Sequence, residues 1–369
     1  MHKEQRQQTH ALLRQSQIDQ ALFARPESVK WLTGFAAPVQ LGMHLQAASY
    51  PLVWYDAGQY HLITVDAYAE LANPYQDSDL NVSTYQGYRV DGPIESGKRL
   101  LELFRKLAVP RPGVRIGLER EYVSELVAAQ LRTDDGSIAI DGWLERLRQI
   151  KTAEELAVLR RNFGLGDVGH VAARNAVAVG KREIDVWGVG HNAIEQAAGC
   201  RVPLGNDCVL GRRAYSGWPL NYEIAETDSV IVDFSVILDG YWSDSCGTYY
   251  PGEKTPTQTK IHQVVYDALE YAISLVKPGV VARTIDQKVR QFITDKGYPN
   301  YPHHTGHGVG VSGHEAPRIV PYSAEILHEG MVIMLEPGIY LPGETGVRLE
   351  EGMLILSDGV ELLTHHDKS

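Results

Sequence analysis

Residues 229–244, with the sequence SVIVDFSVILDGYWSD, place the tightest constraint on what this chain can fold into. The run is apolar and β-branched on both sides of Asp239-Gly240, the dipeptide that a two-residue type I′ hairpin favours. Counting outward from this turn sets Asp233 opposite Cys246 and puts Asp233 and Asp244 on one face as diagonal neighbours, roughly 7–8 Å apart. Two like charges on a half-buried face require a compensating partner.

A second hairpin is predicted between Met331 and Glu350. If its loop is symmetric about Gly343, Glu336 and Glu350 stand directly opposite each other, although Pro337-Gly338 predicts a bulge that blurs this register. Directly opposed carboxylates destabilise a strand pair unless a cation lies between them.

The segment HHTGHGVGVSGHEAPR lies between the two hairpins and begins at His303. Its glycines let the backbone pass close to a ligand, and His307 supplies an imidazole there. Four carboxylates and one imidazole favour Mn²⁺, with Co²⁺, Fe²⁺ or Zn²⁺ as alternatives. Two divalent ions that share bridging carboxylates would use all five ligands, which are Asp233, Asp244, His307, Glu336 and Glu350.

Taken singly, several of these residues have a plainer interpretation. His307 or His314 can be a structural histidine, Asp239 is a turn residue, and His365-His366 are expected to be exposed to solvent. Asp233 is harder to explain in this way, because an unpaired buried carboxylate costs several kcal/mol. The five residues together favour a metal site.

Composition limits the class of protein. The 369 residues carry a formal net charge of −11, so neither nucleic-acid binding nor a nucleic-acid partner is expected. Most of this acidity is interpreted as solvated surface, and part of it as ligands for a cation. The three cysteines argue against a disulfide scaffold and favour the cytoplasm. An apolar signal core and an eighteen-residue apolar run are both absent from the sequence, so we expect neither export by that route nor a membrane partner.

Two domains are expected, an α/β domain at residues 1–147 and a second domain at residues 148–369. In the first, apolar runs predict strands at 20–24, 50–55, 61–65 and 114–118, and helical patterns cover 95–107 and 123–131. A capping box at Thr152 and Glu155 predicts a long helix just after the boundary. Further helices are predicted at 181–198, 257–276 and 282–296.

The motifs resemble those of the pita-bread metallopeptidases, the family of methionine aminopeptidases, Xaa-Pro aminopeptidases and prolidases. The matching elements are two aspartates eleven positions apart, the block GHGVG with a histidine seven residues after its own, EPG at Glu336, and VRLE ending at Glu350. The segment LRQIKTAEEL and the α/β region before it are similar to the prolidase branch. The resemblance implies an α/β N-terminal domain followed by an α+β pita-bread catalytic domain, and a homodimer.

The resemblance also implies roles for individual residues. A metal-bridging hydroxide would attack the carbonyl before proline while Glu336 carries the proton to the leaving nitrogen. His314 would donate to the oxyanion, and His303 would shape the proline pocket. Arg318 matches an arginine that holds the free carboxylate of a dipeptide, and Arg348 also matches. Alternatively, either arginine supports a metal-ligand carboxylate.

Two departures from the family pattern stand out. The family carries a histidine about seventeen positions before the first metal aspartate, but no histidine occurs from Asn192 to Ile261. Tyr215, Trp218 or Asn221 could take its place in contacting the substrate. Cys246 stands where a threonine normally supports the metal ligands, and it is interpreted as a small buried residue or as a redox switch.

The leading hypothesis is a metallopeptidase that cleaves Xaa-Pro bonds, in dipeptides in preference to longer peptides, so the expected partner is a small peptide with proline in the second position. One alternative is an Xaa-Pro aminopeptidase that acts on longer peptides. Other C–N hydrolysis, as in creatinase, is a further alternative, although creatinase lacks the metal ligands that are intact here. A non-catalytic binding protein on the same fold is the last, and it would be expected to have lost some ligands.

Overall fold

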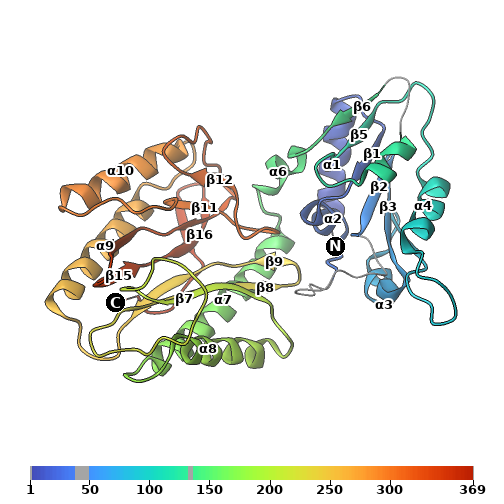
Figure 1. Cartoon of the computed structure of the whole chain (residues 1–369). Helices are drawn as coiled ribbons and strands as arrows, with labels where there is room; N and C mark the ends of the chain where they lie inside the picture. The colour runs from blue at the N-terminus through green and yellow to red at the C-terminus, as the bar shows by residue number, and fades with distance from the viewer. Residues whose placement is uncertain (1, 38–49, 132–135, 369) are drawn as a thin grey trace. The chain divides into compact units, whose positions relative to one another are not determined.

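The computed structural model describes residues 2–37, 50–131 and 136–368 (Figure 1). By its internal contacts the chain divides into an N-terminal unit, Met1–Arg148, and a C-terminal unit, Gln149–Ser369. Each unit is described by itself.

The N-terminal unit is built on one mixed sheet, in which six strands are described in the order β4-β3-β2-β1-β5-β6. The parallel pairs are β3 with β4, β1 with β5, and β5 with β6, whereas β2 is antiparallel to both its neighbours. The strands are β1 (Gln20–Phe23), β2 (Leu52–Asp56), β3 (Gln59–Val65), β4 (Leu80–Tyr85), β5 (Ile116–Leu118) and β6 (Ser137–Ala139). The four predicted strands correspond to β1, β2, β3 and β5, while β4 and β6 were not predicted.

The N-terminal unit also contains helices and 3₁₀ turns between the strands of this sheet. They are α1 (Lys3–Gln15), α2 (Pro26–Thr33), α3 (Ala69–Ala72), α4 (Ser96–Leu107), α5 (Glu125–Ala128) and α6 (Trp143–Arg148), with 3₁₀ turns η1 (Asp66–Tyr68), η2 (Asn73–Tyr75) and η3 (Ala129–Leu131). Helix α2 begins at Pro26, whose fixed φ suits a first helical position, and it ends at Gly34 in the left-handed conformation. The helix predicted at 123–131 is shorter than expected and closes as a 3₁₀ turn.

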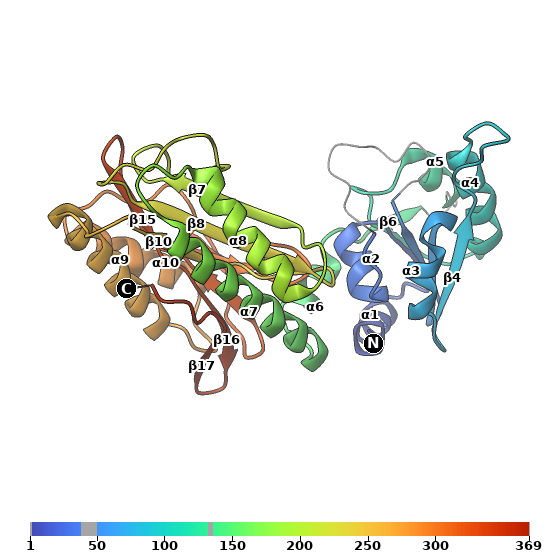
Figure 2. The same cartoon turned by 90° about the horizontal axis from the view of Figure 1, so that it is seen from below.

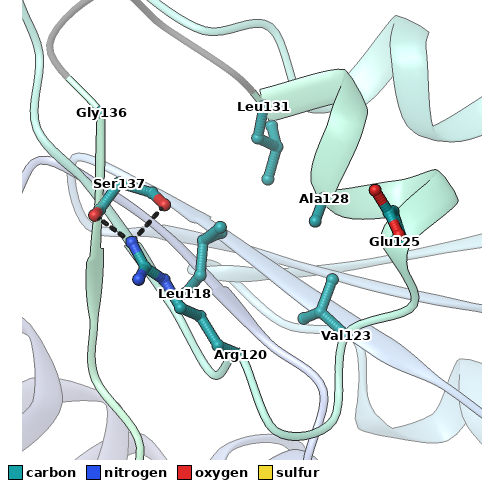
Figure 3. A pocket seen from close by; sticks show the side chains of 8 residues that line it. All are labelled: Leu118, Arg120, Val123, Glu125, Ala128, Leu131, Gly136 and Ser137. Atoms are coloured by element: carbon teal, nitrogen blue, oxygen red, sulfur yellow. Dashed lines mark hydrogen bonds between the residues drawn. The ribbon is translucent and has the colours of Figure 1, made fainter.

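A pocket of the N-terminal unit opens beside α5 (Figure 3). Its lining residues are Leu118, Arg120, Val123, Glu125, Ala128, Leu131, Gly136 and Ser137. Arg120 donates to the hydroxyl of Ser137 at 2.9 Å, so this guanidinium has a partner within the lining. The described lining offers one carboxylate and no imidazole or thiol, and therefore no metal site.

The C-terminal unit contains three described sheets, with the orders β10-β8-β7, β12-β11-β13-β16-β17 and β14-β15, and β9 pairs with β8. Its strands are β7 (Leu204–Leu210), β8 (Val230–Leu238), β9 (Tyr241–Trp242), β10 (Cys246–Tyr249), β11 (Gly306–Gly308), β12 (Glu315–Ile319), β13 (Val332–Leu335), β14 (Gly338–Leu341), β15 (Thr345–Arg348), β16 (Glu351–Leu356) and β17 (Gly359–Leu362).

Four long helices lie outside these sheets in two pairs (Figure 2). They are α7 (Ala153–Ala176), α8 (Glu183–Ala198), α9 (Pro256–Ser274) and α10 (Ala282–Asp295). Each pair closes its own apolar core, α7 and α8 with the β7-β8 sheet, and α9 and α10 with the sheet around β13. The capping box at Thr152 and Glu155 is formed and starts α7 where it was predicted.

The hairpin of β8 and β9 confirms the register read from Asp239-Gly240. Both turn residues have positive φ, 51° and 71°, as a type I′ turn requires. Asp233 pairs with Cys246 as predicted. The strand pairing that begins at β8 therefore delivers both aspartates to one face of the sheet.

The second hairpin holds its register throughout, so the predicted bulge at Pro337-Gly338 is wrong. Leu335 pairs with Glu351 on one side of the interruption and Gly338 with Arg348 on the other, and both pairs belong to the same register. The ladder is interrupted here rather than shifted, because Pro337 has no N–H to donate.

The prediction that His366 is exposed to solvent is wrong, because this residue is buried. Its ring stacks on that of His170 with centroids 3.9 Å apart, and its Nδ1 lies 3.0 Å from a carboxylate oxygen of Asp167. His365 is exposed as expected. Among the described residues, no helix is both long and apolar enough to span a bilayer.

Helix α8 packs closely against strand β8 where Gly190 meets Phe234. A Cβ added at Gly190 would lie 2.4 Å from the Cζ of Phe234, whereas one added at Gly188 in the same helix meets nothing within 4 Å. We expect Gly190→Ala to lower the free energy of unfolding by about 1–3 kcal/mol, because Phe234 is fully buried and must shift. Thermal or denaturant unfolding measures this.

Gly188→Ala is the matched control. It should leave the free energy of unfolding unchanged or raise it by about 0.5–1 kcal/mol, because alanine favours helix interiors over glycine. Equal effects of the two substitutions would contradict the close contact between α8 and Phe234.

Candidate metal centre

Three of the five expected ligands lie at interruptions or ends of strands in the C-terminal unit, and two lie within strands. Asp233 lies within β8, and Asp244 lies between β9 and β10. His307 is the middle residue of β11, while Glu336 and Glu350 occupy the two gaps that flank the β14-β15 hairpin. Residues far apart in the sequence thus meet here, and Asp244, Glu336 and Glu350 lie where regular strand pairing is interrupted.

The Nε2 atom of His307 lies at the centre of this group. It is 3.5 Å from a carboxylate oxygen of Glu336, 3.7 Å from one of Asp244 and 3.9 Å from one of Glu350. Asp244, His307 and Glu350 offer ligand atoms that all lie within 4.8 Å of one another. The structure therefore brings these four predicted residues together, and Asp233 adjoins them through its side-chain interaction with Asp244.

The protein has few charges to balance these carboxylates. Burial, followed by repulsion from neighbouring carboxylates, raises the pKa of both Asp244 and Glu350 well above the ordinary value. Desolvation likewise raises the pKa of Asp233 to about 6, although the cation of Arg348 opposes the shift. Desolvation lowers the pKa of His307 to about 3, so its imidazole is neutral at physiological pH.

Two buried atoms fit a bound cation. Nε2 of His307 and Oε2 of Glu350 have no hydrogen-bond partner among the described residues. The Nδ1 of His307 donates to the carbonyl of Gly308 at 2.9 Å, which leaves the lone pair of Nε2 facing the carboxylates. Unpartnered buried acceptors of this kind are costly unless a cation satisfies them, and carboxylate and imidazole donors suit divalent metals.

Glycines let β11 run close to its neighbours at this point. A Cβ on Gly306 would lie 2.0 Å from the carbonyl oxygen of Met334, and one on Gly308 would lie 2.3 Å from that of Ala316. Only glycine fits at both positions that flank His307.

Arg348 is buried and engaged with carboxylates rather than open to substrate. Its Nη2 donates to Asp233 at 2.7 Å and to Asp207 at 3.0 Å, and its Nη1 donates to the carbonyl of Tyr215 at 2.7 Å. Asp207 pairs directly with Asp233 across β7 and β8. Asp207 was not predicted from the sequence. The signal that could have found it is a carboxylate in a strand-like segment that precedes the strand of Asp233.

Aromatic rings form a wall beside Glu336. Both nitrogens of His303 are engaged: Nδ1 donates to the carbonyl of His304 at 2.9 Å, and Nε2 accepts from the hydroxyl of Tyr340 at 2.8 Å. The ring of Tyr215 lies over that of His303, with centroids 6.2 Å apart and an interplanar angle of 27°. Tyr340 was not singled out from the sequence.

Of the three residues considered as substitutes for the absent histidine, the structure brings Tyr215 to this wall. Trp218 is 79% exposed, and its backbone carbonyl accepts a hydrogen bond from Arg213 at 3.0 Å. Asn221 accepts a hydrogen bond from Arg182 at 2.8 Å.

His314 and Arg318 border the other side of the metal ligands. The side chain of His314 is 51% exposed, and its Nε2 lies 3.9 Å from a carboxylate oxygen of Asp244. Arg318 pairs with His307 across β12 and β11 and is partly exposed. Its guanidinium donates to the carbonyl of His314 at 3.3 Å and forms no ion pair with the carboxylates of the five expected ligands.

His304 was not predicted and lies nearest to Glu336. Its Nε2 is 2.7 Å from Oε1 of Glu336, and its ring centroid is 5.0 Å from those of both His307 and His314. The only sequence signal was a second histidine beside His303.

Cys246 is fully buried behind these ligands. Its Sγ lies 3.6 Å from the carbonyl oxygen of Arg348, and burial raises the pKa of its thiol well above the ordinary value. An inaccessible, protonated thiol fits the small-residue interpretation better than a redox switch.

Comparison with known proteins identifies the class. The model of metallopeptidase family M24 matches residues 158–357, and the model of the creatinase/prolidase N-terminal domain matches residues 5–150. The chain therefore belongs to metallopeptidase family M24. The predicted α/β domain followed by a pita-bread catalytic domain is confirmed, as is the prediction of a metallopeptidase, a hydrolase that uses divalent metal ions.

Individual relatives point to the prolidase branch of this family. The chain is 33% identical over 232 residues to the Xaa-Pro dipeptidase of Pyrococcus furiosus, an alignment that covers 62% of this chain and 67% of that one. It is equally similar to an uncharacterized peptidase of Staphylococcus aureus (strain USA300), 33% over 232 residues, and spans slightly less than two thirds (66%) of that relative. The solved prolidase of P. furiosus superposes with a TM-score of 0.80 at 26% identity, covering 97% of this chain and 99% of that chain.

Metal uptake should release protons in a pH-dependent amount. Asp233, with a pKa of about 6, is largely protonated at pH 5 and ionised at pH 8, whereas His307 is neutral at both. We expect binding of divalent ions to release at least about one more proton at pH 5 than at pH 8, because the ligands must be deprotonated and the raised pKa values of Asp244 and Glu350 can only add to the difference. Titration calorimetry in buffers of different ionisation enthalpy counts these protons. Equal release at both pH values would contradict the raised pKa of Asp233.

Proposed function

We propose that this metallopeptidase hydrolyses the Xaa-Pro bond, in dipeptides in preference to longer peptides. The observation that carries the dipeptide preference is Arg318, a partly exposed guanidinium beside His307 that is not engaged with a carboxylate of the metal centre. An arginine fork recognises a carboxylate bidentately, and a dipeptide presents its carboxylate one residue beyond the scissile bond. The sequence identity of 33% to the Xaa-Pro dipeptidase of Pyrococcus furiosus also supports a preference for dipeptides.

We assign Asp233, Asp244, His307, Glu336 and Glu350 as ligands of two divalent ions. Such ions polarise a carbonyl and generate a nucleophile at neutral pH. Mn²⁺ is the first choice for four carboxylates and one imidazole, followed by Co²⁺, Zn²⁺ and Fe²⁺. The two unpartnered buried atoms, Nε2 of His307 and Oε2 of Glu350, support this assignment.

Other residues hold the substrate and move its protons. Burial alone would raise the pKa of Glu336, but the hydrogen bond of His304 and the nearby imidazoles hold it well below the ordinary value, so this carboxylate is ionised at neutral pH. His314 is exposed and neutral, because desolvation and His304 lower its pKa to about 4, and its ring can donate to the developing oxyanion. Proton transfer by Glu336 to the leaving nitrogen completes the cleavage.

The proline ring of the substrate is assigned to the aromatic wall of Tyr215, His303 and Tyr340. Stacked rings present an apolar surface that suits a pyrrolidine. Arg348 has the role of holding Asp233, because its guanidinium already binds Asp207 and Asp233.

We also propose a cytoplasmic location and a homodimer for this protein. The three cysteines are free, which suits the reducing cytoplasm. A homodimer is proposed from the resemblance to the family.

A peptidase assay with added Mn²⁺ tests the substrate class. We expect Xaa-Pro dipeptides to be cleaved faster than Xaa-Pro-Yaa tripeptides, and non-proline dipeptides to be cleaved least. Chromatographic detection of free proline is the measurement. Cleavage of tripeptides without dipeptides would point to an aminopeptidase, and no cleavage by metal-loaded protein would point to a binding protein.

Replacement of Arg318 tests the carboxylate contact. Arg318→Ala should reduce kcat/KM for dipeptides on the order of 10- to 100-fold, since a charge-assisted pair contributes about 1.5–3 kcal/mol, while metal affinity stays unchanged. Arg318→Lys should recover part of the loss. The matched control is Arg283→Ala, which removes another guanidinium bound to a backbone carbonyl, that of Ser323. Parallel loss of metal affinity and turnover would mean that Arg318 supports the metal ligands.

A further inference from the structure

We propose that His304 is a sixth protein ligand of the metal centre, binding the same ion as His307 and Glu336. The inference rests on the proposed metal site and extends it, because His304 lies outside the set of five ligands. Its Nε2 is 2.7 Å from Oε1 of Glu336, and Nε2 of His307 is 3.5 Å from the same oxygen.

These separations suit donors to one ion. Two donors that each lie about 2.0–2.2 Å from an ion are about 3 Å apart at right angles and about 4 Å apart when opposite. The ligand nitrogens of His304, His307 and His314 all lie within 4.8 Å of one another. Nε2 of His307 is buried without a hydrogen-bond partner among the described residues, so it points into this space ready for an ion.

The other nearby imidazoles are less suitable as the added ligand. His303 uses one nitrogen to donate to the carbonyl of His304 and the other to accept from Tyr340, so it has no nitrogen left for an ion. His314 is half-exposed, and the nearest metal-ligand carboxylate oxygen is 3.9 Å from its Nε2, against 2.7 Å for His304. His304 is therefore the imidazole best placed to complete the coordination of the ion on His307.

A change of tautomer accompanies binding. In the metal-free protein Nε2 of His304 donates its hydrogen to Glu336. With an ion bound, that hydrogen would sit on Nδ1 and the lone pair of Nε2 would face the ion. Glu336 exchanges a hydrogen bond for a shared cation.

A second imidazole changes which metal the centre prefers. Nitrogen donors suit Co²⁺, Zn²⁺ and Fe²⁺, whereas Mn²⁺ prefers carboxylate and water oxygens. With His304 included, one of the two ions has a nitrogen-rich set and the other keeps an oxygen-rich set. The expected result is stronger discrimination in favour of Co²⁺ over Mn²⁺ at one of two sites.

The substitution His304→Gln distinguishes a role of His304 as a metal ligand from a role as a hydrogen-bond donor to Glu336. The glutamine amide nitrogen reaches about as far as Nε2 and can still donate to Glu336, but it is a poor metal ligand. His304→Ala removes both functions. His365→Gln is the matched control, because His365 is exposed and lies outside the metal centre.

Calorimetric titration of the full-length apo protein with Co²⁺ and with Mn²⁺ gives the affinity of each site. For His304→Gln we expect one Co²⁺ site to weaken on the order of 10- to 100-fold and Mn²⁺ binding to weaken much less. X-ray absorption of the Co²⁺-loaded protein should show imidazole scattering that decreases in His304→Gln and not in His365→Gln.

Two results would overturn the proposal. Unchanged Co²⁺ affinity and imidazole scattering in His304→Gln, with a loss confined to His304→Ala, would make His304 a positioning residue for Glu336. Equal weakening of Co²⁺ and Mn²⁺ in His304→Gln would exclude a selective nitrogen ligand. Because metal binding is measured directly, absence of Xaa-Pro cleavage by wild-type protein would refute the proposed function and leave this inference standing.

Discussion

Mutual repulsion among buried carboxylates is the constraint on which the C-terminal unit depends. Asp244, Glu336 and Glu350 surround one neutral imidazole, and the pKa values of Asp244 and Glu350 are raised by burial and by their neighbours. The remaining structure of the C-terminal unit holds these carboxylates together in spite of their repulsion and desolvation. Interrupted ladders, glycines beside His307 and two helix-covered cores hold the backbone where the side chains must converge. Divalent cations supply the compensating charge.

Arg348 supplies a positive charge beside these carboxylates. Arg348 links Asp207 and Asp233 across two strands and donates to the carbonyl of Tyr215, so its buried guanidinium couples an expected metal ligand to the aromatic wall. Arg318, the other arginine that the family resemblance singles out, is partly exposed. The two arginines differ in their contacts, because the guanidinium of Arg348 pairs with carboxylates and that of Arg318 donates to the carbonyl of His314.

Local patterns gave reliable predictions where the chemistry is local. The type I′ turn at Asp239-Gly240 and the capping box at Thr152 depend on a few neighbouring residues, and both formed as predicted. The register of the second hairpin followed from symmetry about Gly343, while the bulge did not form because Pro337 interrupts the ladder without inserting a residue. His366 was misplaced because its burial depends on stacking with His170, almost two hundred residues earlier in the chain.

The sequence by itself determined the ligand chemistry, the two hairpins and the family, because these follow from residue types at short, fixed spacings. Only the tertiary structure decided which other polar groups lie beside the expected ligands in the candidate metal centre. Asp207 reaches Asp233 through the pairing of β7 with β8, and Tyr215 reaches His303 through its loop. His304 became a candidate ligand because the fold brings it to Glu336. Long-range pairing sets such distances, and spacing along the chain carries no information about them.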